Sequence, residues 1–195
     1  MLPTISSGVI NQATWPQAGD VDDCWAVAAM TALHACASWE TLPSITKYRE
    51  AAGNPDDPTR PDGGTIAQNA KAIRTLWPEI GQLITVSEGR LTWLEFADKA
   101  KDERPACLFV RSGELPSEHQ YGFAGLHAIA VVFIKGTGWK ISNPLAPAQS
   151  RWKDIAGVAV ERAAKAWPGK RIYAVLMPTV EDAFKTHPLY PDCAK

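Results

Sequence analysis

The longest apolar stretch of the chain begins at Cys24. Residues 23–38 carry only three polar side chains after the initial aspartate, so the pattern predicts a helix that is apolar nearly all round and buried. Asp20, Asp22 or Asp23 supplies the N-cap that such a helix needs. The helix therefore starts with a cysteine at its first turn.

Amphipathic patterns with a period of 3.6 residues recur further along the chain. They predict helices over 65–77, where Thr65 is the cap, and over 92–103, where Thr92 is the cap. A more polar helix is expected near 44–52. The segment 152–167, WKDIAGVAVERAAKAW, is interpreted as one further helix.

Short apolar or alternating runs predict strands. These runs occupy residues 82–88, 104–113, 126–134, 139–144 and 170–178. Helices come first and the strands follow as a largely antiparallel group, which predicts an α+β fold with a helical half packed on a small sheet. The chain reads as a single domain, 1–195, with an irregular lead-in over 1–19 and a tail over 179–195.

The turn KGTG at 135–138 joins two strands and decides where their side chains point. A regular two-residue turn places His127 and Asn143 on opposite faces of the sheet. A three-residue loop with a glycine bulge shifts the register by one residue and brings both to one face. We predict a bulge or irregular loop at 135–138.

Charge and hydropathy exclude several classes of partner. The 20 basic and 21 acidic residues nearly cancel and no Lys/Arg cluster stands out, which makes nucleic acid an unexpected partner. No run of 18 apolar residues predicts a membrane span. The N-terminal sequence lacks the pattern of a secretory signal, so synthesis in the cytoplasm is expected.

The four cysteines, at positions 24, 36, 107 and 193, do not have metal-ligand spacing. We expect no metal and no organic cofactor. Cys36 and Cys107 lie within apolar runs and are interpreted as core residues, whereas Cys193 has no evident role. Cys24 is either a small hydrophobe that starts a core helix or a nucleophile, because a helix N-terminus favours the thiolate.

A nucleophilic cysteine needs a base and a group that orients that base. His34 is ten residues along the same helix, about 15 Å from Cys24, and is excluded. His187 lies in the tail and His119 in a polar loop. His127 opens a strand, which is a rigid mount, and Asn143 ends the next strand of the same hairpin, where its side chain can accept from the imidazole.

Three motifs carry a resemblance to a known family. The segment DDCWAVAAM resembles the Cys-Trp-Ala start of the active-site helix in papain-like cysteine peptidases, and HAIAVV and WKISNP resemble that family's His and Asn strands. The order of elements is similar to the compact, bacteriocin-processing (C39-like) type. The resemblance implies Cys24 as nucleophile, His127 as general base and acid, and Asn143 as orienter.

The resemblance further implies Gln17 as a donor to the oxyanion, and a cleft flanked by loops 53–64 and 112–125. Trp25 and Trp152 are the aromatic residues placed at this cleft, although Trp25 is also interpreted as a core residue, and Trp152 either shields the His127–Asn143 pair or only packs. The implied reaction is hydrolysis of a peptide or amide bond, in a Gly-containing peptide or a peptidoglycan cross-link. Small proteins of this kind also resemble phage tail-associated peptidases, so a virion with other tail proteins as partners is a further expectation.

Two features depart from the family pattern. Asp22 and Asp23 stand where the family has Gly or Ser, and a carboxylate beside a thiol opposes its ionisation. Gln17 is one residue further from Cys24 than the common spacing. The alternative hypothesis is therefore a catalytically silent papain-like protein that serves as an assembly or docking module in a virion tail.

Overall fold

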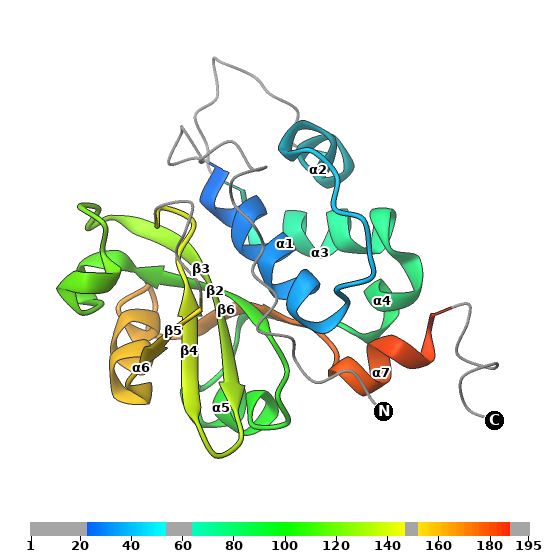
Figure 1. Ribbon diagram of the computed structural model, residues 1–195. Helices are drawn as coiled ribbons and strands as arrows, with labels where there is room; N and C mark the ends of the chain where they lie inside the picture. The colour runs from blue at the N-terminus through cyan, green and yellow to red at the C-terminus, as the bar shows by residue number, and fades with distance from the viewer. Residues whose placement is uncertain (1–22, 54–63, 147–151, 188–195) are drawn as a thin grey trace.

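The computed structural model describes residues 23–53, 64–146 and 152–187 (Figure 1). These residues form seven α-helices and one six-stranded antiparallel sheet, with strand order β1-β6-β2-β3-β4-β5. The helices are α1 Cys24–Cys36, α2 Ile45–Ala52, α3 Ile66–Leu76, α4 Pro78–Leu83, α5 Trp93–Ala100, α6 Gly157–Lys165 and α7 Val180–Lys185. The strands are β1 Thr85–Leu91, β2 Ala106–Arg111, β3 Leu126–Ile134, β4 Gly138–Ser142, β5 Lys153–Ile155 and β6 Ile172–Leu176. The predicted α+β organisation is confirmed.

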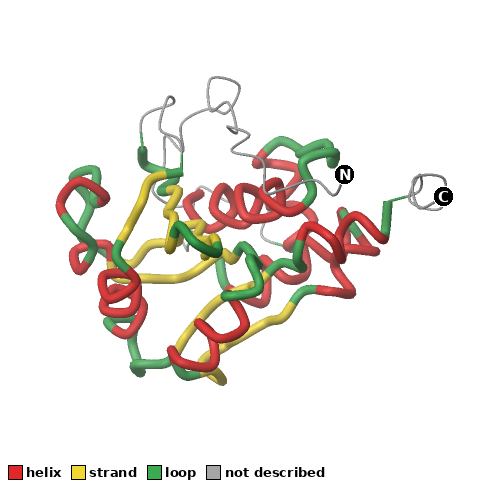
Figure 2. The backbone as a smooth tube through the Cα atoms, turned by 60° about the horizontal axis from the view of Figure 1, so that its bottom comes forward, coloured by secondary structure: helices red, strands yellow, loops and turns green. Residues whose placement is uncertain are grey.

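The sheet separates two groups of helices (Figures 1 and 2). Helix α1 packs on β2 and β3, with α2 and α3 beside it, whereas α5 and α6 cover the other face. Successive side chains of β2 point to opposite faces of the sheet. Cys107 and Phe109 belong to the core on the α1 side, whereas Leu108 and Val110 belong to the core on the α6 side. The sheet is therefore buried on both faces, and α1 is central.

Local sequence fixes the ends of the helices. Thr65 accepts from the Gln68 backbone N–H while the Gln68 side chain returns to the Thr65 N–H, a complete capping box at the start of α3. Thr92 and Glu95 form the same arrangement at α5. The predicted caps at Thr65 and Thr92 are confirmed. Gly53 ends α2 with a φ of 73°, the left-handed conformation that a residue without Cβ adopts at least cost.

The segment 152–167, predicted as one helix, is instead divided. Residues Lys153–Ile155 form strand β5, which pairs with β4 through Trp139 and Ile155, and helix α6 begins only at Gly157. Pairing at the edge of the sheet overrides the helical preference of the sequence before Gly157. Two short helices, α4 and α7, were not predicted. The strand predicted over 82–88 begins only at Thr85, because its first two residues, Gln82 and Leu83, belong to α4.

The β3–β4 hairpin has the irregular loop that was predicted. Ile134 pairs with Gly138 and Val131 with Ile141, so three residues close the turn. Gly136 and Gly138 have φ values of 81° and 102°, which glycine tolerates. In this register odd-numbered residues of β3 pair with odd-numbered residues of β4 and share a face with them. His127 and Asn143 therefore lie on the same side of the hairpin.

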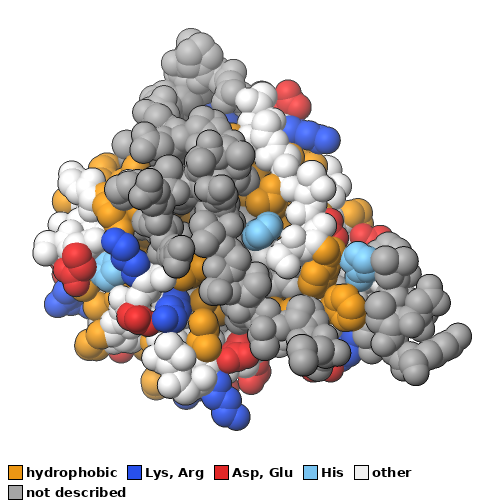
Figure 3. Space-filling model, in the orientation of Figure 1, with side chains coloured by type: hydrophobic (Ala, Val, Ile, Leu, Met, Phe, Trp, Pro, Cys, Tyr) orange, Lys and Arg blue, Asp and Glu red, His pale blue; other side chains and the backbone are white. Residues whose placement is uncertain are grey.

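The structure also bears on the membrane expectation. No helix within 23–53, 64–146 and 152–187 is both long enough and apolar enough to cross a bilayer. The surface seen in Figure 3 intersperses acidic and basic side chains over the described part of that face.

Candidate active site

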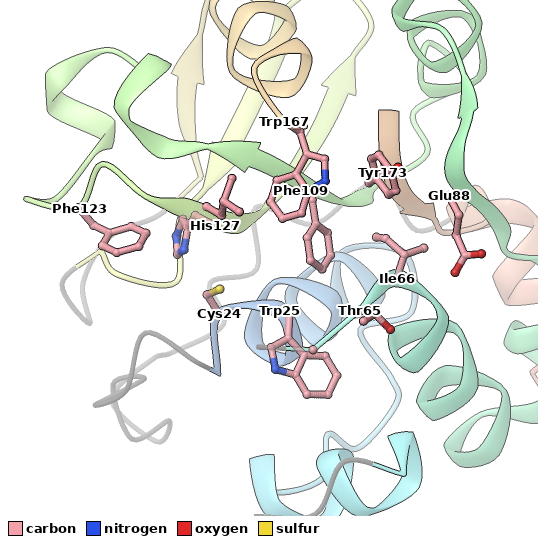
Figure 4. Close-up of a pocket in the computed structure, with 12 residues that line it drawn as sticks. Cys24, Trp25, Thr65, Ile66, Glu88, Phe109, Phe123, His127, Trp167 and Tyr173 are labelled. Carbon is pink, nitrogen blue, oxygen red and sulfur yellow. The ribbon is translucent and has the colours of Figure 1, made fainter. Parts of the chain in front are cut away.

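A pocket of about 700 Å³ opens beside the N-terminus of α1. Cys24 and His127 lie on facing sides of it at one end, and Tyr173 and Glu88 lie at the other end (Figure 4). The wall is largely aromatic and aliphatic. Its lining residues are Cys24, Trp25, Gly64, Thr65, Ile66, Glu88, Phe109, Phe123, Leu126, His127, Trp167 and Tyr173.

Cys24 is the first residue of α1 and is 8% exposed. The backbone N–H groups of a first helical turn have no partner within the helix, and with the helix dipole they stabilise a thiolate or an oxyanion. Asp23 occupies the N-cap position, but its side chain makes no capping hydrogen bond to this turn. The Asp23 carboxylate therefore does not accept a hydrogen bond from the first-turn N–H groups.

The Asp23 carboxylate is instead engaged by a cation. Arg49 of α2 approaches it to 2.7 Å, and Arg49 is 8% exposed. An opposite charge at this distance offsets much of the field that a carboxylate exerts on its neighbours. Asp23 therefore opposes ionisation of Cys24 less than the sequence alone suggests. Asp22 lies outside the described residues.

His127 is held through one ring nitrogen. Its Nε2 lies 2.8 Å from Oδ1 of Asn143, which also accepts from the Leu145 N–H at 2.9 Å. The Asn143 amide nitrogen donates to the His119 carbonyl at 2.8 Å. These two backbone partners fix which end of the amide is the oxygen. Because that oxygen only accepts, Nε2 of the neutral imidazole must carry the hydrogen.

The other nitrogen of His127, Nδ1, is then the one that can accept a proton. Nδ1 is buried and makes no hydrogen bond to the residues that the structure describes, so its lone pair is available on the side of the pocket. Burial lowers the pKa of His127, and the hydrogen bond to Asn143 opposes this in part. The Phe123 ring packs edge-on against the imidazole, with centroids 5.5 Å apart. Neutral His127 is thus positioned to take a proton.

The remaining histidines do not enter the pocket lining. His34 lies near the far end of α1, and burial lowers its pKa. His119 contributes its backbone carbonyl to Asn143 rather than its ring. His187 packs with Trp39 and Phe184 beside α7. The structure therefore brings His127, and not these histidines, to the side of the pocket that faces Cys24.

The other described cysteines have a different character. Cys36 is buried, and desolvation raises the pKa of its thiol to about 12. Cys107 is also buried, and desolvation raises the pKa of its thiol. Its sulfur accepts from the buried amide of Asn69 at 3.5 Å. Both thiols are therefore structural and protonated at neutral pH, as predicted for core residues. Cys193 lies outside the described residues.

The predicted cleft residues have different outcomes. Trp25 lines the pocket and packs against Gly64, where a Cβ would lie 2.0 Å from the indole. Trp152 is half-buried, packs on the core around α1 and is not among the pocket-lining residues. Gln17 lies outside the described residues. Of the loops expected to flank the cleft, 112–125 contributes Phe123, and 53–64 is described only at its two ends.

Sequence reasoning missed most of the pocket wall. Phe109 lies on β2, Tyr173 on β6 and Glu88 on β1. Trp167 lies in the segment just after α6, and no local pattern links the four residues. Arg49 was missed for the same reason, since its partner is 26 positions away in the chain. Among the described residues, no group of three or more His, Cys, Asp or Glu side chains could hold a metal ion.

Comparison of the chain with protein-family models, with curated proteins and with solved structures yields no match. The function must therefore be argued from the residues of the site.

Proposed function

We propose that this protein is a cysteine peptidase or amidase of papain-like type, with Cys24 as nucleophile, His127 as general base and acid, and Asn143 as orienter. The carrying observation is the His127–Asn143 pair. It fixes the hydrogen on Nε2 and leaves Nδ1 as an acceptor on the pocket side, opposite the cysteine at the start of α1. Nucleophile, base and orienter are the three parts that thiol-dependent acyl transfer requires.

In the acylation step, the Cys24 proton passes to Nδ1 of His127. The thiolate then attacks the substrate carbonyl carbon, and the carbonyl oxygen becomes an oxyanion. The first-turn N–H groups of α1 are oriented to stabilise that charge, and Gln17 is the side chain that we propose as a second donor. The C–N bond breaks as His127 returns its proton to the leaving amine, and a thioester on Cys24 remains.

In the deacylation step, neutral His127 removes a proton from water and hydroxide attacks the thioester. The C–S bond breaks, the carboxylic acid leaves, and the proton returns to the sulfur. Asn143 acts through His127 in both steps: its oxygen accepts from Nε2–H whether the ring is neutral or charged, and so stabilises the imidazolium. No redox partner is required.

The substrate class is a peptide or a peptidoglycan cross-link, and a phage tail is the proposed setting. These two assignments rest on the resemblance of the three sequence motifs. The alternative, a silent docking module in the same setting, drew its support from Asp22 and Asp23. The Arg49–Asp23 ion pair removes part of that support.

Alkylation of thiols tests the proposal without knowledge of the substrate. Iodoacetamide should modify Cys24 of the folded protein at pH 7 about tenfold faster than it modifies a free cysteine peptide. His127→Ala should abolish this advantage. Peptide mapping by mass spectrometry assigns each modified thiol, and the buried Cys36 and Cys107 serve as internal controls. An ordinary rate that is unchanged in His127→Ala would contradict an active site and favour the docking module.

A direct assay follows from the same variants. Purified protein is incubated with Gly-rich peptides and with isolated peptidoglycan, and new amino termini are measured. Cys24→Ala is the matched control because it removes only the sulfur.

A further inference from the structure

The end of the pocket opposite His127 combines an acidic side chain with aromatic rings. Phe109 and Trp167 meet edge to face with centroids 5.2 Å apart, and Trp167 and Tyr173 follow at 6.0 Å. Beyond them lies Glu88 (Figure 4). Aromatic faces next to a carboxylate are the recurring arrangement by which proteins bind organic cations.

The backbone explains why Glu88 lies beside Tyr173. The two residues are direct partners in the antiparallel pairing of β1 with β6, so their side chains share a face of the sheet. The register shifts immediately after Glu88, and Gly89 has a φ of 73°. A Cβ at Gly89 would lie 3.0 Å from the Tyr173 hydroxyl, so glycine lets the ring lie over the bulge.

The carboxylate of Glu88 is not neutralised by a cation among the described residues. Its side chain makes no ion pair and no hydrogen bond to the residues that the structure describes, and none of the described residues that line the pocket is Lys or Arg. The pocket is therefore apolar along its length and anionic at its far end. A ligand group that matches it has a long apolar stem and a cationic head, as lysine and arginine side chains do.

The position of His127 decides which part of the substrate enters. In the proposed mechanism His127 protonates the leaving amine, so the leaving group must lie on its side of Cys24. The aromatic end leads away from both Cys24 and His127, toward Trp167 and Tyr173 (Figure 4). The assignment of the acyl part to the end that carries Glu88 is the part of the inference that the acyl-side probes below test.

We infer that this protein cleaves after a segment with a basic side chain, whose methylenes pack on Trp167 and Tyr173 and whose cation pairs with Glu88. This inference rests on the proposed function and names its substrate class. Because Glu88 is exposed, the pair contributes a preference rather than an absolute requirement.

Matched peptidyl chloromethyl ketones test the inference. The Cys24 sulfur displaces chloride from the methylene carbon, so each probe reports occupancy of the acyl side. The probes carry norleucine at all three acyl positions, with one position replaced by lysine or by glutamate. At one of these positions lysine should react about fivefold to tenfold faster than norleucine, and glutamate should react more slowly than norleucine.

Variants of Glu88 test whether this residue causes the preference for the lysine probe. Glu88→Gln should reduce the ratio of the lysine rate to the norleucine rate to within about twofold, and Glu88→Lys should favour the glutamate probe. Glu79→Gln, an exposed glutamate on α4 away from the pocket, is the matched control and should retain the preference.

Two distinct failures are possible. If iodoacetamide shows a fast Cys24 that depends on His127, but no position prefers lysine or Glu88→Gln keeps the preference, the inference is overturned and the proposed function stands. If Cys24 shows no His127-dependent reactivity toward iodoacetamide, the proposed function fails and the inference fails with it.

Discussion

The guanidinium of Arg49 lies 2.7 Å from the carboxylate of Asp23, the residue directly before Cys24. Arg49 belongs to α2 and is nearly buried, so the ion pair ties α2 to the start of α1. It places a compensating positive charge beside an acidic residue that adjoins Cys24. The pair thus acts on the position and the electrostatics of the first turn rather than on the substrate.

Removal of Arg49 should make Cys24 harder to ionise. In Arg49→Met the Asp23 charge is unopposed, so the midpoint of the pH profile for Cys24 alkylation should rise by roughly 0.5 to 1 pH unit. Asp23→Asn should lower the midpoint. The double variant should return it close to the wild-type value, because neither charge is then present. If Arg49→Met does not move the midpoint while the protein stays folded, the electrostatic role is wrong.

The His127–Asn143 bond should matter for reactivity and for stability. Asn143→Ala removes the acceptor of Nε2–H and leaves the His119 carbonyl and the Leu145 N–H without their partner. We expect the free energy of unfolding to fall by about 1–3 kcal/mol. Alkylation of Cys24 near pH 6 should slow on the order of tenfold because the imidazole is no longer oriented.

Asn143→Asp is the matched variant for this prediction. It keeps an acceptor for Nε2–H but loses the donor to the His119 carbonyl. It should therefore retain more of the Cys24 reactivity than Asn143→Ala. Equal reactivity in wild type and Asn143→Ala, measured on folded protein, would show that Asn143 has no role in orienting the base.

Folding stability should decrease as the pH falls below neutrality. Burial lowers the pKa of His127 relative to 6.5, its value in an unfolded chain, and burial also lowers the pKa of His34 and His119. Between the folded and unfolded values the unfolded state binds more protons, so unfolding becomes easier as the pH drops through 6.5. Well above 6.5, where these histidines are unprotonated in both states, they contribute no slope.

Urea unfolding at pH 7.5 and pH 5.5 measures this effect. The loss of stability between the two pH values should be smaller in His127→Gln than in the wild type, because glutamine does not titrate. Surface Lys185→Gln is a control for substitution itself and should keep the wild-type difference. An unchanged difference in His127→Gln would mean that His127 titrates normally.

The parts of the site that the sequence predicts are those with local signals. The run after Asp23 has a helical composition and an obvious start, which places Cys24 at a helix N-terminus. The 135–138 turn is compatible with two loop lengths, and only the three-residue loop, which was predicted, brings His127 and Asn143 to one face. Hydrophobic periodicity and turn residues depend on neighbours along the chain, so they can be recognised from a single sequence.

The parts that the sequence does not predict depend on tertiary contact. Strand β5 exists because β4 offers an edge to pair with, although its residues precede a helical pattern without a break. Trp152, for which a place at the cleft and simple packing were both considered, packs on the core. The wall formed by Phe109, Trp167 and Tyr173 assembles from three elements whose order along the chain does not indicate their proximity.

Gly64 should be essential for the shape of the pocket. A Cβ at this position would lie 2.0 Å from the Trp25 ring, and Trp25 is 1% exposed, so the indole can yield only toward the pocket that it lines. Gly64→Ala should lower the free energy of unfolding by about 1–3 kcal/mol through overpacking. It should also slow the peptidyl chloromethyl ketones more than it slows iodoacetamide, because the displaced indole narrows the pocket rather than disabling the thiol.

Gly136→Asn is the control for this prediction. Gly136 has a φ of 81°, no atom lies within 4 Å of a Cβ built there, and asparagine tolerates the left-handed region. It should change stability by less than about 1 kcal/mol and leave both alkylation rates as in the wild type. If Gly64→Ala is as stable as this control and keeps the wild-type ratio of peptidyl ketone to iodoacetamide rates, Trp25 does not depend on the glycine. The wall it forms beside Cys24 is then adaptable rather than fixed.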